Sequence, residues 1–132
     1  MLSPERGGIL LRGIRGAVSV SENSRSAILD ACTVLLRRMM DQNQLAPEEM
    51  VAVFFTLTDD LNAAFPAEAA RAMGLDRVPL LCLREVAVPG AMASVLRILM
   101  LVNRDGPLSS VRHVYLGEAR KLRQDLEEIR TP

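Results

Sequence analysis

Aromatic side chains are scarce in this chain, and their scarcity excludes one broad kind of function. Among 132 residues there is no tryptophan, one tyrosine and three phenylalanines. So few rings cannot form the stacking platform on which proteins bind single-stranded nucleic acids. Sixteen basic and sixteen acidic side chains leave no net charge, whereas a nucleic-acid partner calls for a basic surface. We therefore expect no nucleic acid among the partners of this protein.

Cysteine and histidine, which supply most zinc ligands, are equally rare. Cys32 and Cys82 lie far apart in the sequence, and His113 is the only histidine. A zinc site needs several such ligands at short, regular spacings, and these spacings are absent. Two distant cysteines also do not indicate a disulfide framework. We expect neither a metal site nor a disulfide.

Long apolar runs are missing as well. No stretch approaches the roughly 20 apolar residues needed to cross a bilayer. Residues 1–8 contain a proline, two glycines and charged residues, and they lack the basic and then apolar pattern of a secretion signal. We expect a cytoplasmic protein without a membrane segment, in which residues 1–8 form a flexible extension.

The residues that are present indicate one folded domain. Apolar residues make up 49% of the chain and charged residues 24%, as in a globular protein. A chain of this length builds a single hydrophobic core, which must be aliphatic because rings are so few. One domain over residues 1–132 is therefore expected, with a mobile C-terminal tail at 118–132. A near-neutral, apolar-rich chain also favours self-association.

Hydrophobic periodicity predicts a mixture of strands and helices. Apolar and β-branched residues predict strands over the stretches 10–20, 50–57, 78–86, 94–102 and 112–116. A long amphipathic helix is expected to begin after a cap at Asn23 or Ser24 and to run to about residue 43, and a second helical region is expected over 58–74. The run 94–102 is short enough to be helical instead. The pattern predicts an α+β fold, with a mixed β-sheet and helices on one face.

Charged side chains inside the predicted strands are the most informative feature. Arg15, Glu85 and Arg97 each lie in an otherwise apolar run. Because an unpaired buried charge is strongly destabilising, each needs water, a protein partner or a ligand. Strand alternation toward solvent, or an ion pair between Arg97 and Glu85, would explain them without a function. The functional alternative is a cavity that presents guanidinium groups to a small carboxylate, which the planar fork of arginine binds with two hydrogen bonds.

Other common active sites lack their parts here. Segment 13–16 has no lysine followed by serine or threonine, as a phosphate-binding loop requires. Nothing around His113 indicates a nucleophile elbow, and Cys82, inside an apolar run, is more typical of a small core residue. An anion pocket without a nucleophile, a metal or a general base suits a binding protein, or an enzyme that works by electrostatics and positioning alone.

Several segments, taken in order, resemble the AroH-type chorismate mutases. They are Arg12-Gly13-Ile14-Arg15-Gly16-Ala17, then Asp60-Leu61 through Ala64-Phe65-Pro66-Ala67, then Val78-Pro79 with Cys82 and Glu85, then Arg112-His113-Val114-Tyr115-Leu116. In the tail, Leu122-Arg123 before Asp125-Leu126 also matches. Each piece alone is weak, but the ordered set is specific and covers about residues 10–126.

The resemblance implies a homotrimer with the pseudo-α/β barrel fold of that family, in which the active sites lie between subunits. It implies conversion of chorismate to prephenate by a [3,3] Claisen rearrangement, on the route toward phenylalanine and tyrosine, without a cofactor. Two rival functions stay open: a non-catalytic trimer that binds a small carboxylate, and an imine deaminase of the RidA-like type, whose fold is similar and which also uses a buried arginine.

By position, the resemblance also implies roles for individual residues. Arg97 would donate to the ether oxygen and a nearby carboxylate, and Arg15 and Tyr115 would hold carboxylate groups. Glu85 would accept a hydrogen bond from the ring hydroxyl, aided by the region around Cys82.

The other substrate contacts implied in this way fall on a neighbouring wall of the cleft. Phe65 and Ala67 would line the cleft from the adjacent subunit, with Arg71 near its entrance. Glu68 and Leu81 depart from the family pattern. No substrate contact is transferred to the Glu68 carboxylate, and Leu81 would contact the substrate through its backbone.

Overall fold

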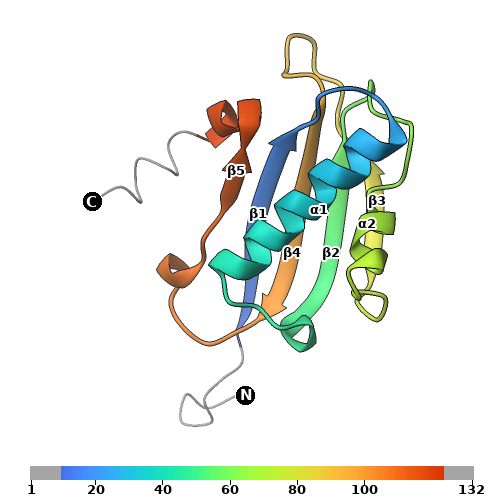
Figure 1. Ribbon diagram of the computed structural model, residues 1–132. Coiled ribbons are helices and arrows are strands. Elements are labelled where there is room, and N and C mark those ends of the chain that lie inside the picture. Colours follow the sequence, from blue (N-terminus) through green and yellow to red (C-terminus); the bar gives the residue numbers. More distant parts are fainter. Residues whose placement is uncertain (1–9, 124–132) are drawn as a thin grey trace.

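The computed structural model describes residues 10–123 and contains one five-stranded β-sheet with helices beside it (Figure 1). The strands are β1 (Leu11–Ser19), β2 (Met50–Leu57), β3 (Leu80–Arg84), β4 (Val95–Asn103) and β5 (Val114–Leu116). The helices are α1 (Arg25–Gln42) and α2 (Ala67–Ala72), with 3₁₀ turns η2 (Pro47–Glu49), η3 (Leu108–Ser110) and η4 (Gly117–Arg123). The expected α+β class is confirmed. The predicted extension 1–8 and the tail beyond residue 123 lie outside the described residues.

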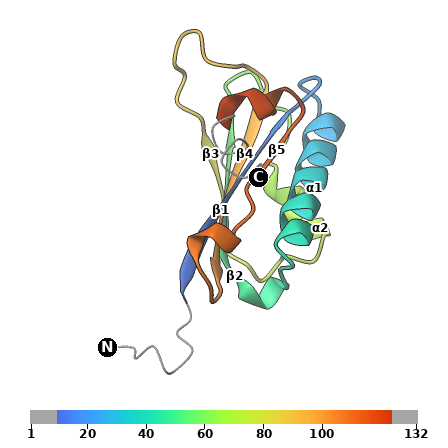
Figure 2. The same cartoon turned by 90° about the vertical axis from the view of Figure 1, so that its left-hand side faces the viewer.

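The sheet is mixed and is built around β4. Its strand order is β3-β2-β4-β1-β5, with β4 antiparallel to both β1 and β2, while the pairs β1–β5 and β2–β3 are parallel. Helix α1 connects β1 to β2, and helix α2 lies in the connection from β2 to β3. Figure 2 shows both helices on the same side of the sheet. Neither α1 nor α2 lies on the opposite face, which η4 covers at one end.

Helix α1 closes the hydrophobic core against the helix-covered face. The side chain of Ser24 accepts a hydrogen bond from the backbone N–H of Ala27, which is an N-cap of the expected kind. The buried side of the helix then packs on alternate residues of the strands, and Leu35, Ile98 and Phe55 are all within the core. A glycine at position 16 is needed for this approach.

At Gly16, a Cβ atom would lie 2.3 Å from the sulfur of Met39, which is far inside van der Waals contact. The absence of a side chain on this residue of β1 lets the last turns of α1 lie directly on the strand. The glycine in the first predicted strand thus marks a close approach of helix and sheet, as a glycine inside a strand commonly does.

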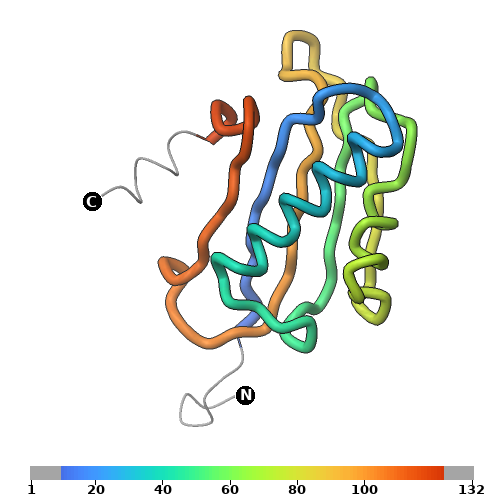
Figure 3. Tube along the Cα trace, in the orientation of Figure 1, coloured from blue at the N-terminus to red at the C-terminus, as the bar shows by residue number. Residues whose placement is uncertain are grey.

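Successive side chains along each strand point alternately to the helix-covered face and to the opposite face, which is the open face of the sheet. Ile98 and Met100 of β4 are buried under α1, whereas their neighbours Arg97 and Leu99 point to the open face. Near one end of this face, η4 covers the sheet, and its Ala119 is fully buried against Ala17. The loop that joins β3 to β4 extends beyond that same end of the sheet (Figure 3).

Several predicted boundaries differ from the observed ones. The helical region expected over 58–74 is helical only in α2, because the residues before it form turns held by Asn23, whose side chain accepts from the backbone N–H groups of Asn62 and Ala63. The third and fifth strands are shorter than expected, and the helical alternative for 94–102 is wrong. Residues 118–123, placed in the expected tail, belong to η4.

Candidate active site

Three of the four central candidates lie in one row across the open face. Ala17 in β1 is paired with Arg97 in β4 on one side and with Tyr115 in β5 on the other. Arg15 lies two residues before Ala17 on the same strand and therefore faces the same way. The strand register thus brings two guanidinium groups and one phenol to the same face of the sheet.

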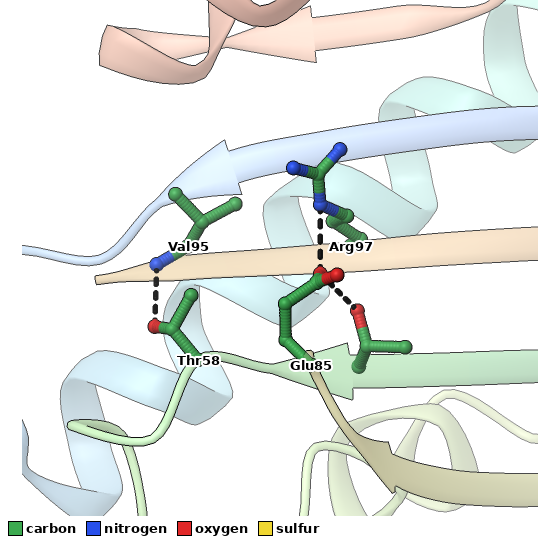
Figure 4. A network of polar contacts seen from close by, with 5 residues as sticks. Thr58, Glu85, Val95 and Arg97 are labelled. Atoms are coloured by element: carbon green, nitrogen blue, oxygen red, sulfur yellow. Dashed lines mark hydrogen bonds and ion pairs between the residues drawn. The ribbon is translucent and has the colours of Figure 1, made fainter. Parts of the chain in front are cut away.

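Glu85, the fourth central candidate, joins this row through an ion pair. Its Oε1 lies 2.8 Å from Nε of Arg97 and accepts a hydrogen bond of 3.0 Å from the hydroxyl of Thr56. The Nε–H does not point straight along this contact, so it is an ion pair rather than a well-aligned hydrogen bond. Figure 4 shows both terminal nitrogens of Arg97 directed away from Glu85. The pair orients the guanidinium while its terminal nitrogens stay available to a ligand.

The two explanations that need no function are therefore partly correct. Arg97 and Glu85 do form an ion pair, and alternation does place them on the open face, where their side chains are 40% and 27% exposed. Neither charge is deeply buried in the single chain. They line a pocket of about 420 Å³ together with Asp60 and the β3–β4 loop, from Val86 to Ala93. A ligand in this pocket would lie against the charged pair.

The start of β4 is fixed by a group of hydrogen bonds that the sequence did not indicate. Asp60 accepts from the hydroxyl of Ser94 at 2.7 Å and from its backbone N–H at 3.2 Å. Ser94 has a φ of 57°, a left-handed conformation that costs free energy for a residue other than glycine. Thr58 accepts from the backbone N–H of Val95 (Figure 4). These contacts position Arg97, two residues further along β4.

Hydrogen bonds to its carboxylate lower the pKa of Asp60 to about 2, with the hydroxyl of Ser94 as the largest cause and the hydroxyl of Thr58 next. The carboxylate is mostly exposed, so burial opposes this shift only slightly. Asp60, in the segment 60–67 that resembles the family, thus helps to fix the start of β4, a role that the resemblance alone did not assign. Its partner is 34 residues away in the sequence, and no short spacing could reveal it.

A second pocket, of about 430 Å³, holds another group of candidates. Phe65 and Cys82 line it. The side chain of Phe65 is 68% exposed, although it is the largest apolar residue of its segment. Such exposure is unusual for an aromatic residue with no other part in the described fold and marks the pocket as a place for a ligand or a partner.

Ala67 and Arg71 lie near Cys82 but are not part of the lining of this second pocket. Burial raises the pKa of the Cys82 thiol, while the backbone N–H of Ala67 and the charge of Arg71 act in the opposite direction. Burial raises the pKa of Cys32 to about 12. A raised pKa keeps both thiols protonated at neutral pH, and a protonated thiol is a weaker nucleophile than a thiolate.

The two pockets do not merge in the single chain. They share Thr58 and Asp59, but Arg97 and Glu85 line only the first, and Phe65 and Cys82 line only the second. The side chains of Leu81 and Cys82 point to opposite faces of the sheet, because they are successive residues of β3. Leu81 is 51% exposed. Within residues 10–123, these four candidates line the two pockets, and the lining of neither pocket includes Arg15, Ala67, Arg71, Leu81 or Tyr115.

His113 is a second residue whose local role the sequence did not indicate. Its Nδ1 accepts a hydrogen bond of 2.9 Å from the backbone N–H of Arg15. The imidazole thereby continues the β1–β5 pairing one residue beyond the ladder that ends at Gly16 and Val114. Because Tyr115 follows two residues later, this single bond helps fix the spacing between Arg15 and Tyr115.

Other site types find no support in residues 10–123. No group of three acidic, histidine or cysteine side chains there could hold a metal ion. Likewise, no helix in this part of the chain is both long enough and apolar enough to cross a membrane.

Comparison with known proteins decides the family. A family model for chorismate mutase type I matches residues 11–126. The chain belongs to this family. Two curated relatives are named chorismate mutase AroH. The one from Thermus thermophilus is 54% identical over 119 residues, 89% of this chain and 98% of the relative. The one from Bacillus subtilis is 38% identical over 119 residues, 89% of this chain and 94% of the relative.

A solved structure agrees in fold. A chorismate mutase from Clostridium thermocellum superposes with a TM-score of 0.81 at 40% sequence identity, over 83% of this chain and 97% of that one. The chorismate mutase family expected from the ordered motifs is confirmed, and with it the assignment of the chain as an isomerase. The rival assignment to a RidA-like deaminase is not supported.

Proposed function

We propose that this chorismate mutase rearranges chorismate to prephenate in clefts that form where two copies of the chain meet in a homotrimer. The observation that carries the proposal is that four of the candidate residues are divided between two pockets of one chain. Arg97 and Glu85 line one pocket and Phe65 and Cys82 line the other. A second copy of the chain would place its Phe65 wall opposite the arginines of the first.

The open face of the sheet supports assembly into an oligomer. Leu81, Leu83 and Leu99 are 51%, 46% and 42% exposed there. Leucine side chains on the face of a sheet are usually covered, and a contiguous apolar surface is typical of an interface. In a ring of three, each chain would meet its neighbours through two different surfaces. That arrangement would generate three equivalent clefts.

Arg97 would supply the main catalytic effect. As the carbon–oxygen bond of the substrate breaks, its ether oxygen gains negative charge, and a fixed guanidinium stabilises that charge more than it stabilises the bound substrate. Glu85 holds Nε of Arg97 and Figure 4 shows the terminal nitrogens directed elsewhere. The fork is therefore oriented before the substrate arrives, which is the condition for electrostatic catalysis of this kind.

The other residues of the row would bind and orient the substrate. Arg15 and Tyr115 would hold carboxylate groups, and Glu85 would accept a hydrogen bond from the ring hydroxyl. The β1–β4 and β1–β5 registers place Arg15 and Tyr115 on the same face of the sheet as Arg97, to which Glu85 is joined by its ion pair. Such a surface would select the compact conformer in which the two reacting ends of the substrate are close.

The second wall would come from the neighbouring subunit. Phe65 and Ala67 would close the cleft over the substrate ring, with Arg71 near the entrance. The backbone of Leu81 and the Cys82 region would complete this side. We propose no cofactor, and we propose the cytoplasm as the location of the enzyme.

The first experiment follows the loss of chorismate absorbance in the ultraviolet on mixing with purified protein, and prephenate is identified by acid conversion to phenylpyruvate. Saturable loss without added metal or cofactor is the expected result. If the protein is folded and trimeric but chorismate is lost no faster than in the uncatalysed reaction, the proposed activity is contradicted. That result would also favour the non-catalytic carboxylate-binding trimer, and measured binding of a dicarboxylate would then establish that alternative.

A further inference from the structure

A bidentate ion pair lies at the second pocket, the one lined by Phe65 and Cys82 (the Phe65 pocket). Nη1 of Arg25 is 2.9 Å from Oε2 of Glu68, and Nη2 is 2.9 Å from Oε1. Arg25 is the first residue of α1 and Glu68 the second residue of α2. Both side chains line the same pocket as Phe65 and Cys82.

The exposure of the pair argues against a role in stability. The side chains of Arg25 and Glu68 are 62% and 30% exposed. An ion pair that faces solvent in this way adds little to the free energy of unfolding. The contact nevertheless holds both charges in a fixed geometry, since the fork of the arginine meets both carboxylate oxygens.

The charge of the pocket wall depends on this contact. Its charged residues are Arg25, Asp59, Glu68 and Arg84. Arg84 pairs with Asp59, with 3.3 Å between Nε and Oδ1, and Arg25 pairs with Glu68. The wall is therefore neutral as a whole. Without Arg25, the carboxylate of Glu68 would be uncompensated on a surface that is proposed to face a substrate with two carboxylates.

We propose that Arg25 is a specificity-determining residue of the cleft, which admits a dianionic substrate by neutralising Glu68. This inference rests on the proposed function, in which the Phe65 pocket forms one wall of the mutase cleft. Arg25 does not contact the reacting atoms in this account. It acts through the carboxylate of Glu68, and its effect is on substrate binding rather than on the rearrangement.

The experiment compares Arg25→Gln, Glu68→Gln and the double variant in the assembled enzyme. For Arg25→Gln we expect KM for chorismate to rise by about three- to ten-fold, from one uncompensated charge close to the substrate in partly screened surroundings. The kcat should change little, because uniform binding is what is lost. The double variant should return KM to near the wild-type value, and Glu68→Gln alone should leave KM equal or lower. The rise should shrink at high ionic strength.

Arg37→Gln is the matched control. Arg37 lies on the exposed side of the same helix, outside the Phe65 pocket, and its substitution changes the net charge equally. A KM for Arg25→Gln equal to that of Arg37→Gln would overturn the inference. A double variant as impaired as Arg25→Gln would also overturn it, because Arg25 would then bind the substrate directly. Wild-type protein without mutase activity would instead refute the proposed function on which the inference rests.

Discussion

The two faces of one β-sheet differ in what they do, although the same strands build both. On the helix-covered face, Leu96 and Ile98 are buried under α1. On the open face, their neighbours Arg97 and Leu99 remain partly exposed. Alternation along β4 thus separates residues that hold the chain folded from residues that would bind substrate and a second copy of the chain. Substitutions on the two faces should therefore affect different measurements.

Arg97→Lys tests the open face and has the largest expected effect. A lysine keeps the charge but loses the rigid fork, and loss of one preorganised donor typically lowers kcat by about 10²–10³-fold. The melting temperature should stay within a few degrees of wild type, because the side chain is 40% exposed. Steady-state kinetics with chorismate and thermal unfolding measure the two effects. A large drop in stability with kcat preserved would contradict the separation of the faces.

Leu96→Ala tests the helix-covered face on the same strand. Leu96 is fully buried, and truncation of a buried leucine costs about 2–5 kcal/mol of unfolding free energy. Leu99→Ala is the matched control on the open face, where the leucine is 42% exposed in the single chain. We expect Leu99→Ala to weaken association more than it destabilises the protomer. Urea unfolding and sedimentation velocity distinguish the two, and equal destabilisation at both positions would contradict the account.

Gly16→Ala sharpens the comparison where helix and sheet come closest. The added methyl group would overlap the sulfur of Met39, and overpacking of this kind typically costs about 1–3 kcal/mol. Because Met39 is flexible at its end, the lower half of that range is expected. Urea unfolding measures the loss, and the kcat of the fraction that remains folded should be unchanged. A stabilised variant would show that α1 does not lie as close to β1 as described.

Asp60→Asn has the smallest expected effect. The pKa of this carboxyl is lowered to about 2 by hydrogen bonds from Ser94 and Thr58. A group with a lowered pKa stabilises the fold above its unfolded pKa, and this stabilisation is lost as pH falls through the folded pKa. Since the contact is exposed, we expect a difference of about 0.5–1 kcal/mol from wild type at neutral pH. The difference should disappear between pH 4 and pH 2, because the pKa of an ordinary aspartate is 3.8 and that of Asp60 in the fold is about 2.

That pH dependence has a clear contrary outcome. Unfolding free energies measured at several pH values should converge for wild type and Asp60→Asn toward low pH. If the difference is constant from neutral to acidic pH, the charge of Asp60 does not hold Ser94. Ser94→Gly serves as the companion variant. Glycine adopts a φ of 57° without strain, so relief of that strain should offset the loss of the Ser94 hydroxyl in the free energy of unfolding.

Local sequence patterns predicted most of the elements but not their arrangement. The periods of the apolar residues located the strands and the long helix, because these periods follow from strand and helix geometry. The strand order depends on pairings between distant segments, which no local period contains. The stretch 58–66 was predicted as helical, yet its polar residues form turns that Asn23 holds from another part of the chain.

The candidate site shows the same limit. Arg97 and Glu85 were identified because a charge inside an apolar run is conspicuous, and the ion pair between them was one of the explanations considered. The contacts of Arg25 with Glu68 and of His113 with Arg15 join segments that are far apart in sequence, and their residue types are common. Only the fold brings them together.

Complementation between two impaired variants tests the central claim most directly. Arg97→Lys alters one proposed wall of the cleft, and Phe65→Glu would place a repelling charge on the other. If each cleft combines walls from two chains, random mixing of the two variants by co-expression should restore about one quarter of the clefts. The account predicts mutase activity well above that of either variant alone. Activity no greater than the average of the two parents would show that each chain builds its own site.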